Sequence, residues 1–333
     1  MLGRWGTNWG KSRALNFRFS YGGMQVLNQS TLADRVDLTG RGLHSGTPAR
    51  ISLRPAAPNT GIVFKLHGKK VSVGPEAVRN TDFATVIGDT NGSKCSTVEH
   101  LMAALAGLGV DNAIIEVEGD EIPAFDGSSA NFVEAIDSVG IETQEAARRY
   151  IKVLKPIKVE DGRCTGELLP YDAGFRVEIE IDFPHAAIGR QRFAGMITPE
   201  VFREELSRAR TFGFMRDVAK LWGAGYALGA SLDNTICLAD DRIVNPEGLR
   251  YADEFVRHKA LDAVGDLAMA GLPILGRYRS ACGGHKLNAA VVAALMADRS
   301  AWTVVEAESA RRRRRAHAEL GTQVAPAYRA DLS

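Results

Sequence analysis

The chain has 333 residues, 45% of them hydrophobic, and a formal net charge of +1. Its length is enough for two domains with a core each, while the near-zero charge excludes nucleic-acid binding by bulk electrostatics. No run of 18 apolar residues predicts a membrane span, and four widely spaced cysteines favour a reducing compartment.

Residues 1–23 are expected to lie outside the fold, as a disordered leader or because the start is mis-assigned. They hold four basic residues, no acidic residue and no apolar block, which is not the pattern of a secretory signal. A transit peptide, a disordered leader, and an upstream start codon with Met24 as the true beginning all fit this composition.

From Met24 to residue 149, short alternating segments predict a first α+β domain. Ser96 and Glu99 have the spacing of a capping box, and helical periodicity follows them up to Leu108. The charged segment 142–149 is expected to be a helix-like join. The expected strands are 36–39, 49–53, 61–66 and 112–117, and the expected helices are 98–108 and 129–139.

Residues 150–310 repeat the order of strands and then helices, which predicts a second α+β domain. The arginine-rich tail, 311–333, has a run of five arginines typical of a solvated helix end or tail. Contact with anionic lipid is the alternative. The expected strands are 150–159, 165–169, 175–183, 234–240 and 273–280, and the expected helices are 199–208, 254–266 and 287–297.

The helix expected at 254–266 carries His258, Asp262 and Asp266 at four-residue intervals. Side chains four residues apart lean over the same turn, so His258 and Asp262 could bind one metal ion. The apolar residues of this helix fall on another side. A solvated polar face explains the same stripe without a metal, and on this helix alone it is the simpler explanation.

Glu99 and His100 are adjacent near the start of the first-domain helix. Taken singly, they fit a helix cap and an ordinary histidine. Together they resemble half of a metallohydrolase site, in which a histidine binds zinc and a glutamate takes a proton from water. His258 and Asp262 would complete a three-ligand open zinc site.

Two further segments carry polar groups that such a site could use. His285 follows a Cys-Gly-Gly sequence, which predicts a mobile loop histidine, and Asp266 is a candidate partner that would favour its protonated form. Thr211 stands near a helix end among arginines and aromatic residues and could donate to an oxyanion. An ordinary glycine-rich turn and an aromatic-packed helix end are the alternatives.

Several motifs match one protein family in the same order, between about Thr31 and Trp302. The matching segments are 40–46, 96–101, 121–123, 126–128, 207–217 and 253–266. They resemble the zinc-dependent UDP-3-O-acyl-N-acetylglucosamine deacetylases of lipid A biosynthesis. The resemblance implies two α+β domains of similar topology, each with helices layered on a β-sheet and each with an insert. The active site would lie at the domain interface.

The same resemblance implies which residues hold the metal. It places zinc ligands at His100, His258 and Asp262, and a general base at Glu99. Two histidines and one carboxylate suit iron(II) as well as zinc, so both ions remain open.

The remaining implied roles surround this centre. His285, held by Asp266, matches a histidine that acts as acid or charge stabiliser, and Thr211 matches an oxyanion-stabilising threonine. An insert within 213–248 would line the passage of the acyl chain. The residues implied for substrate binding are Leu43, Phe212, Phe214 and Lys259.

The implied reaction is hydrolysis of the N-acetyl amide of UDP-3-O-acyl-N-acetylglucosamine with release of acetate, the committed step of lipid A biosynthesis. The resemblance implies an amphiphilic UDP-sugar as substrate. The protein is expected to be a cytoplasmic monomer without a transmembrane segment, and transient contact with a membrane stays open. Two rivals stay open. One is a metal-dependent deacetylase of another sugar, and the other is a non-catalytic relative whose structural metal would need no base at Glu99.

Overall fold

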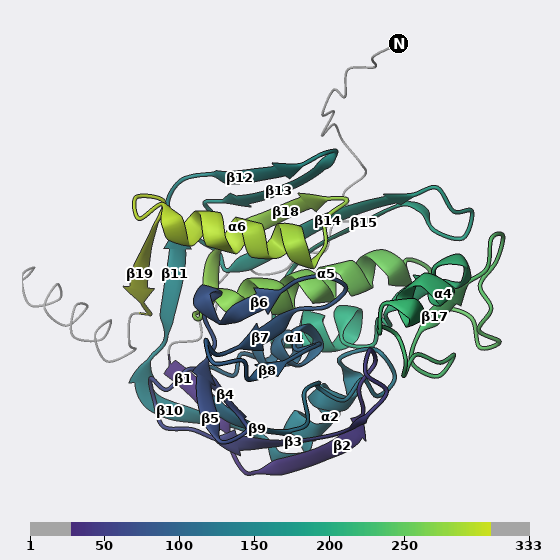
Figure 1. Cartoon of the computed structure of the whole chain (residues 1–333). Helices are drawn as coiled ribbons and strands as arrows, with labels where there is room; N and C mark the ends of the chain where they lie inside the picture. The colour runs from purple at the N-terminus through teal and green to yellow at the C-terminus, as the bar shows by residue number, and fades with distance from the viewer. Residues whose placement is uncertain (1–27, 308–333) are drawn as a thin grey trace, which may run out of the picture.

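The computed structural model describes residues 28–307, so the leader 1–23 and the tail 311–333 lie outside the described residues. Figure 1 shows two main sheets on opposite sides of the molecule with helices between them. In the middle, α1 (Glu99–Leu108) packs against α5 (Glu254–Leu267). This arrangement of helices on sheets confirms the expected fold class.

The first half of the chain forms one main sheet and two small ones. Its main sheet has the order β2-β3-β9-β4-β5, in which β9 runs parallel to β4 and antiparallel to β3, while β6-β7-β8 and β1-β10 form the small sheets. The elements are β1 (Asn28–Leu32), β2 (Val36–Arg41), β3 (Pro48–Pro55), β4 (Ile62–Leu66), β5 (Lys69–Ser72), η1 (Pro75–Ala77), β6 (Val78–Asn80), β7 (Val86–Gly88), β8 (Lys94–Cys95), α1, β9 (Ala113–Glu118), α2 (Ala130–Val139) and β10 (Ile141–Ala147).

The second half forms a seven-stranded sheet covered by α5 and α6. Its central strand β18 pairs with β11, β13 and β14, while α5 packs on β14 and α6 on β12 and β13. The elements are β11 (Arg149–Val153), β12 (Ile157–Asp161), β13 (Cys164–Leu169), β14 (Phe175–Phe183), β15 (Gly189–Met196), α3 (Pro199–Val201), the π-helical η2 (Phe202–Leu206), β16 (Phe212–Phe214), α4 (Met215–Gly223), β17 (Ile236–Leu238), α5, η3 (Ala268–Ala270), β18 (Ile274–Ala281), α6 (His285–Ala297) and β19 (Trp302–Glu306).

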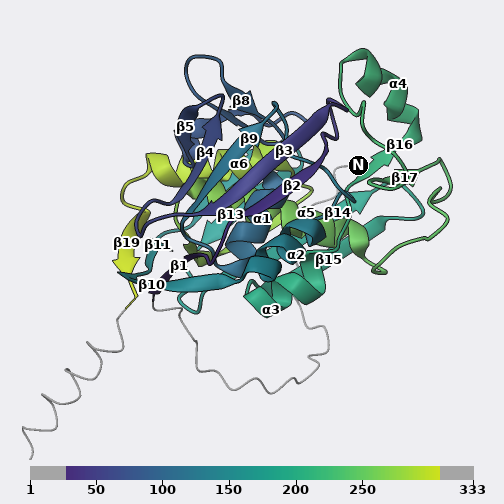
Figure 2. The same cartoon turned by 90° about the horizontal axis from the view of Figure 1, so that it is seen from below.

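The two halves share one continuous core. A single cluster of buried apolar side chains includes Phe64 and Leu101 from the first half and Phe255 and Tyr278 from the second. Figure 2, seen from below, shows α4, β16 and β17 together at one side of the molecule. None of the helices within residues 28–307 combines the length and the apolarity that a bilayer crossing requires.

Two predictions of local structure in the first half are wrong. The segment expected as a helix-like join at 142–149 is mostly strand β10, because its backbone pairs with β1, more than 100 positions away in the sequence. The capping box is also absent, since α1 begins only at Glu99. The Ser96 hydroxyl instead donates to the Asp120 carbonyl oxygen at 3.0 Å.

The polar stripe of α5 is not a solvated face. His258, Asp262 and Asp266 are each at most 2% exposed, because α1, α6 and the sheet of the second half enclose the helix. Only Arg257 and Lys259 within α5 are more than slightly accessible. Burying polar side chains is costly unless they find hydrogen-bond partners or a metal. The explanation of this stripe as a solvated polar face is therefore wrong.

Gly265 permits the close crossing of α1 and α5. A Cβ atom at this position would lie 2.0 Å from the Glu99 carbonyl oxygen and 3.1 Å from the Ala103 nitrogen. We expect Gly265→Ala to lower the free energy of unfolding by about 1–3 kcal/mol, measured by urea denaturation. In the control Gly223→Ala the new methyl group meets nothing within 4 Å, so stability should stay equal or rise. Equal stability of the two variants would contradict a tight crossing.

Candidate active site

The crossing of α1 and α5 brings three predicted ligands together. One ligand atom from each of His100, His258 and Asp262 can be chosen so that all lie within 4.8 Å of one another. Asp262 Oδ1 is 3.5 Å from His100 Nε2 and 3.3 Å from His258 Nε2. All three side chains are buried. His100 and His258, which are 158 positions apart in the sequence, therefore face the same point as Asp262.

The polar atoms of this cluster fit a metal ion. Asp262 Oδ1 is buried and makes no hydrogen bond within residues 28–307, which is costly unless an ion binds it. His258 Nδ1 donates to the Ala209 carbonyl oxygen at 3.0 Å, so the lone pair of this neutral ring is on Nε2, toward Asp262. Burial lowers the pKa of His258 to about 3 despite the charge of Asp262, and the neutral ring is the form that binds metals.

Ala209 is held in position by a buried ion pair. The neighbouring Arg210 donates to Glu254, the first residue of α5, through its backbone nitrogen at 3.0 Å and its Nε at 2.9 Å. Glu254 is fully buried and Arg210 is 2% exposed. This pair ties the start of α5 to the segment whose carbonyl oxygen orients His258.

Glu99 and His285 lie beside the ligand cluster. Glu99 Oε1 is 3.9 Å from His285 Nε2, and His285 Nε2 is 4.0 Å from Asp262 Oδ2. Burial raises the pKa of Glu99, an effect that His285 and His100 oppose. A carboxyl group with a raised pKa is a suitable proton acceptor.

Asp266 holds His285, as the sequence predicts. The distance from His285 Nδ1 to Asp266 Oδ2 is 2.9 Å. Burial alone would lower the pKa of His285, but Asp266 and Glu99 raise it to about 10, so the ring is protonated at neutral pH. His285 is the first residue of α6, not part of a mobile loop.

Two residues that hold Asp266 and Glu99 in place were not predicted from the sequence. Asn288 Nδ2 donates to Asp266 Oδ2 at 2.8 Å, and its position one helical turn after His285 is a signal that could have found it. The Thr85 hydroxyl donates to Asp266 Oδ1 at 2.6 Å, while its backbone nitrogen donates to Glu99 Oε2 at 3.0 Å. Thr85 lies in a loop, where periodicity gives no signal.

The remaining predicted residues lie at different distances from this centre. The Phe212 ring is 6.4 Å from the His258 ring and 5.6 Å from Lys259 Nζ. Lys259 Nζ donates to Asp262 Oδ2 at 2.8 Å, so its ammonium already has a partner. Thr211 precedes Phe212, whereas the Phe214 ring contacts Phe183, His185 and Arg216 away from the ligands.

Leu43 belongs to a loop that meets the expected insert. The Leu43 and His44 carbonyl oxygens accept hydrogen bonds from the backbone nitrogens of Gly229 and Leu228, both at 3.0 Å. Glu121 holds this loop, because its carboxylate accepts the backbone N–H groups of His44 and its neighbour at 2.8 Å each. Two backbone hydrogen bonds therefore join this loop to the segment expected as the insert.

Comparison with known proteins identifies the family of the chain. A family model described as UDP-3-O-acyl N-acetylglycosamine deacetylase matches residues 29–297. Relatives from Brucella melitensis biotype 2, Brucella ovis and Brucella suis, each named UDP-3-O-acyl-N-acetylglucosamine deacetylase, are 52% identical over 284 residues. These matches cover 84% of this chain and 99% of each relative. The chain therefore belongs to the UDP-3-O-acyl N-acetylglycosamine deacetylase family.

Proposed function

We propose that His100, His258 and Asp262 hold a zinc ion, and that the chain hydrolyses the N-acetyl amide of UDP-3-O-acyl-N-acetylglucosamine with release of acetate. Deacetylation in lipid A biosynthesis follows from the family, which consists of metalloenzymes. The single observation that supports this ligand set is the buried, unpartnered Asp262 Oδ1 facing two imidazole nitrogens. When bound, the metal supplies a Lewis acid that activates water and polarises the amide carbonyl.

Glu99 serves as the general base. Its Oε2 is fixed by the Thr85 backbone nitrogen, which leaves Oε1 facing the space beside His285 and the ligands. The carboxylate there accepts a proton from the attacking water. Burial raises the pKa of this carboxyl, which makes it a stronger base.

His285 supplies positive charge and a proton. Its Nδ1 side is occupied by Asp266, so the free Nε2–H points toward Glu99 and Asp262. From there it can stabilise the developing oxyanion or protonate the leaving amine. Thr211 is proposed as a second oxyanion donor.

The substrate contacts are proposed on the other predicted residues. Phe212 and Phe214 would flank the sugar and the acyl chain, with Leu43 on the opposing loop. Lys259 would contact a phosphate or a sugar oxygen once it leaves its hydrogen bond with Asp262. Exposed apolar side chains in the insert, Trp222 and Leu228, suit an acyl passage.

Asp266→Asn should move the alkaline limb of the kcat/KM pH profile to lower pH. The protonated form of His285 is lost as pH rises through its pKa, which Asp266 helps to raise. Removing that charge lowers the pKa, so activity falls at a less alkaline pH. The control Asn288→Ala removes one hydrogen bond to Asp266 but keeps its charge, and its limb should shift less. An unmoved limb in Asp266→Asn would mean that another group titrates there.

We further propose that the protein is a cytoplasmic monomer. All four cysteines, Cys95, Cys164, Cys237 and Cys282, are free thiols, which suits a reducing compartment. Sedimentation of the purified full chain would test the oligomeric state.

An assay of acetate release from a panel of acylated amino sugars tests the proposed reaction. We expect turnover of the UDP-linked, 3-O-acylated N-acetylglucosamine and much slower turnover of the analogue without the acyl chain. Comparable rates on unrelated N-acetyl sugars would favour a deacetylase of broader specificity. No turnover by the zinc-loaded protein would favour a non-catalytic relative.

A further inference from the structure

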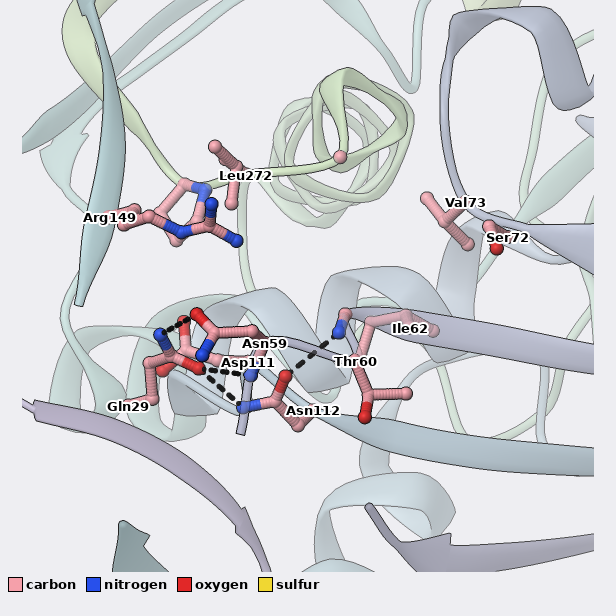
Figure 3. A pocket seen from close by; sticks show the side chains of 13 residues that line it. Gln29, Asn59, Thr60, Ile62, Ser72, Val73, Asp111, Asn112, Arg149 and Leu272 are labelled. Carbon is pink, nitrogen blue, oxygen red and sulfur yellow. Dashed lines mark hydrogen bonds between the residues drawn. The ribbon is translucent and has the colours of Figure 1, made fainter. Parts of the chain in front are cut away.

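A cavity lies between the two halves of the chain, apart from the residues of the active site. It has a volume of about 220 Å³. Figure 3 shows Arg149 and Leu272 of the second half on one side, facing Gln29, Asn59, Asp111 and Asn112 of the first half. No residue given a role in the reaction lines it.

Arg149 is the group in this cavity that needs a partner. Within residues 28–307, its buried Nε makes no hydrogen bond and no carboxylate forms an ion pair with its guanidinium. Glu306 is its register partner on β19 and is not among its ion-pair partners. A buried, unpaired donor is destabilising, so Arg149 calls for an acceptor that the described chain does not supply.

The other charge in the cavity is already neutralised. Asp111 Oδ1 accepts from Arg148 Nε at 2.8 Å, and its Oδ2 accepts from the Ser30 backbone nitrogen at 3.0 Å. The amides opposite Arg149 are also tied together, because Asn112 Nδ2 donates to Gln29 Oε1 at 2.9 Å. The unbalanced charge of the cavity is therefore the positive charge of Arg149.

Neutral donors complete the lining. Gln29 Nε2 donates to Asn59 Oδ1 at 2.9 Å, and the Asn59 amide nitrogen makes no hydrogen bond to the described part of the chain. The hydroxyls of Thr60 and Ser72 line the same cavity and make no hydrogen bond to the described chain. Asn59 and Ser72 are exposed, so a ligand can reach the cavity from solvent.

We propose that this cavity binds a small oxyanion, a phosphate or carboxylate group, anchored by Arg149 and contacted by Asn59, Thr60 and Ser72. Arginine matches the planar, multidentate geometry of both groups. The volume is below that of sites for drug-sized ligands, so the ligand is an ion or a short metabolite. Because both halves line the cavity, the ligand stabilises their packing.

Thermal unfolding of the metal-loaded full chain tests the site. Inorganic phosphate and acetate would be titrated at constant ionic strength, with chloride as the reference anion. We expect a saturable rise in Tm with one of the oxyanions, because a ligand of the folded state stabilises it. The anion that raises Tm more shows whether the site prefers a phosphate or a carboxylate group. The rise should disappear in Arg149→Met and persist in the control Arg299→Met, whose arginine is exposed and stacks on Trp302.

Further variants separate the alternatives. Phosphate stabilises many proteins by exclusion from their surfaces, and an equal, unsaturable rise in all variants would mean this general effect and overturn the proposal. A rise retained in Arg149→Met would place the anion elsewhere, including the active site, and also overturn it. Glu306→Gln should keep the rise in Tm, because the Glu306 carboxylate does not pair with Arg149. Should Arg149→Met not fold, Asn59→Ala must still show a smaller rise than the wild type.

Discussion

Glu99→Gln should lower kcat by about 10²–10⁴-fold, the range for losing a positioned general base. The substitution keeps the shape of the side chain and an oxygen that can accept from the Thr85 nitrogen, so the buried site should stay folded. It removes the carboxylate that takes a proton. KM should change little, because Glu99 is not proposed to bind the substrate. Steady-state kinetics and metal analysis on the same preparation would measure both quantities.

The matched control is Glu118→Gln, at the exposed end of β9. It changes the same functional group far from the reaction and should leave kcat unchanged. Loss of metal from Glu99→Gln would identify Glu99 as a ligand and not as the base. Full turnover with bound metal would rule out a proton transfer through Glu99.

The local part of the site could be predicted from the sequence. The spacing of His258, Asp262 and Asp266 depends only on helical geometry, and α5 occurs within one residue of the expected helix. Adjacency alone likewise joins Glu99 to His100 on α1. What periodicity could not show is that α1 and α5 cross at Gly265, and without that contact the two pairs remain separate polar patches.

Surroundings that depend on distant contacts could not be predicted. The enclosure of α5 comes from α1, α6 and the second sheet, so a stripe that looks solvated in the sequence is buried. Glu99 has the spacing of a helix cap, yet its carboxylate accepts from Thr85, which reaches it through the fold. In the same way, β10 takes its conformation from its pairing with β1. The fold supplied partners that outweighed local preference.

Chelation and His258→Ala should both reduce turnover to background, and zinc should restore only the chelated wild type. Chelation leaves all three ligands in place, whereas the substitution leaves two, too few for the three-ligand site that catalysis requires. Metal analysis before and after chelation, followed by the deacetylation assay, would measure this. If iron(II) also restored turnover, the test would not decide between zinc and iron(II) as the natural ion.

The chelation test requires that the protein stays folded without its metal. Lys259 Nζ donates to Asp262 Oδ2 at 2.8 Å, so the aspartate keeps a charged partner without the ion, and far-UV circular dichroism should survive chelation. His185→Ala is the matched control: His185 is 6% exposed but hydrogen-bonds the Ala239 carbonyl oxygen outside the cluster. That variant should lose stability yet keep its metal. If His258→Ala also kept its metal, His258 would not be needed to hold the ion. The proposed set of three ligands would then be wrong.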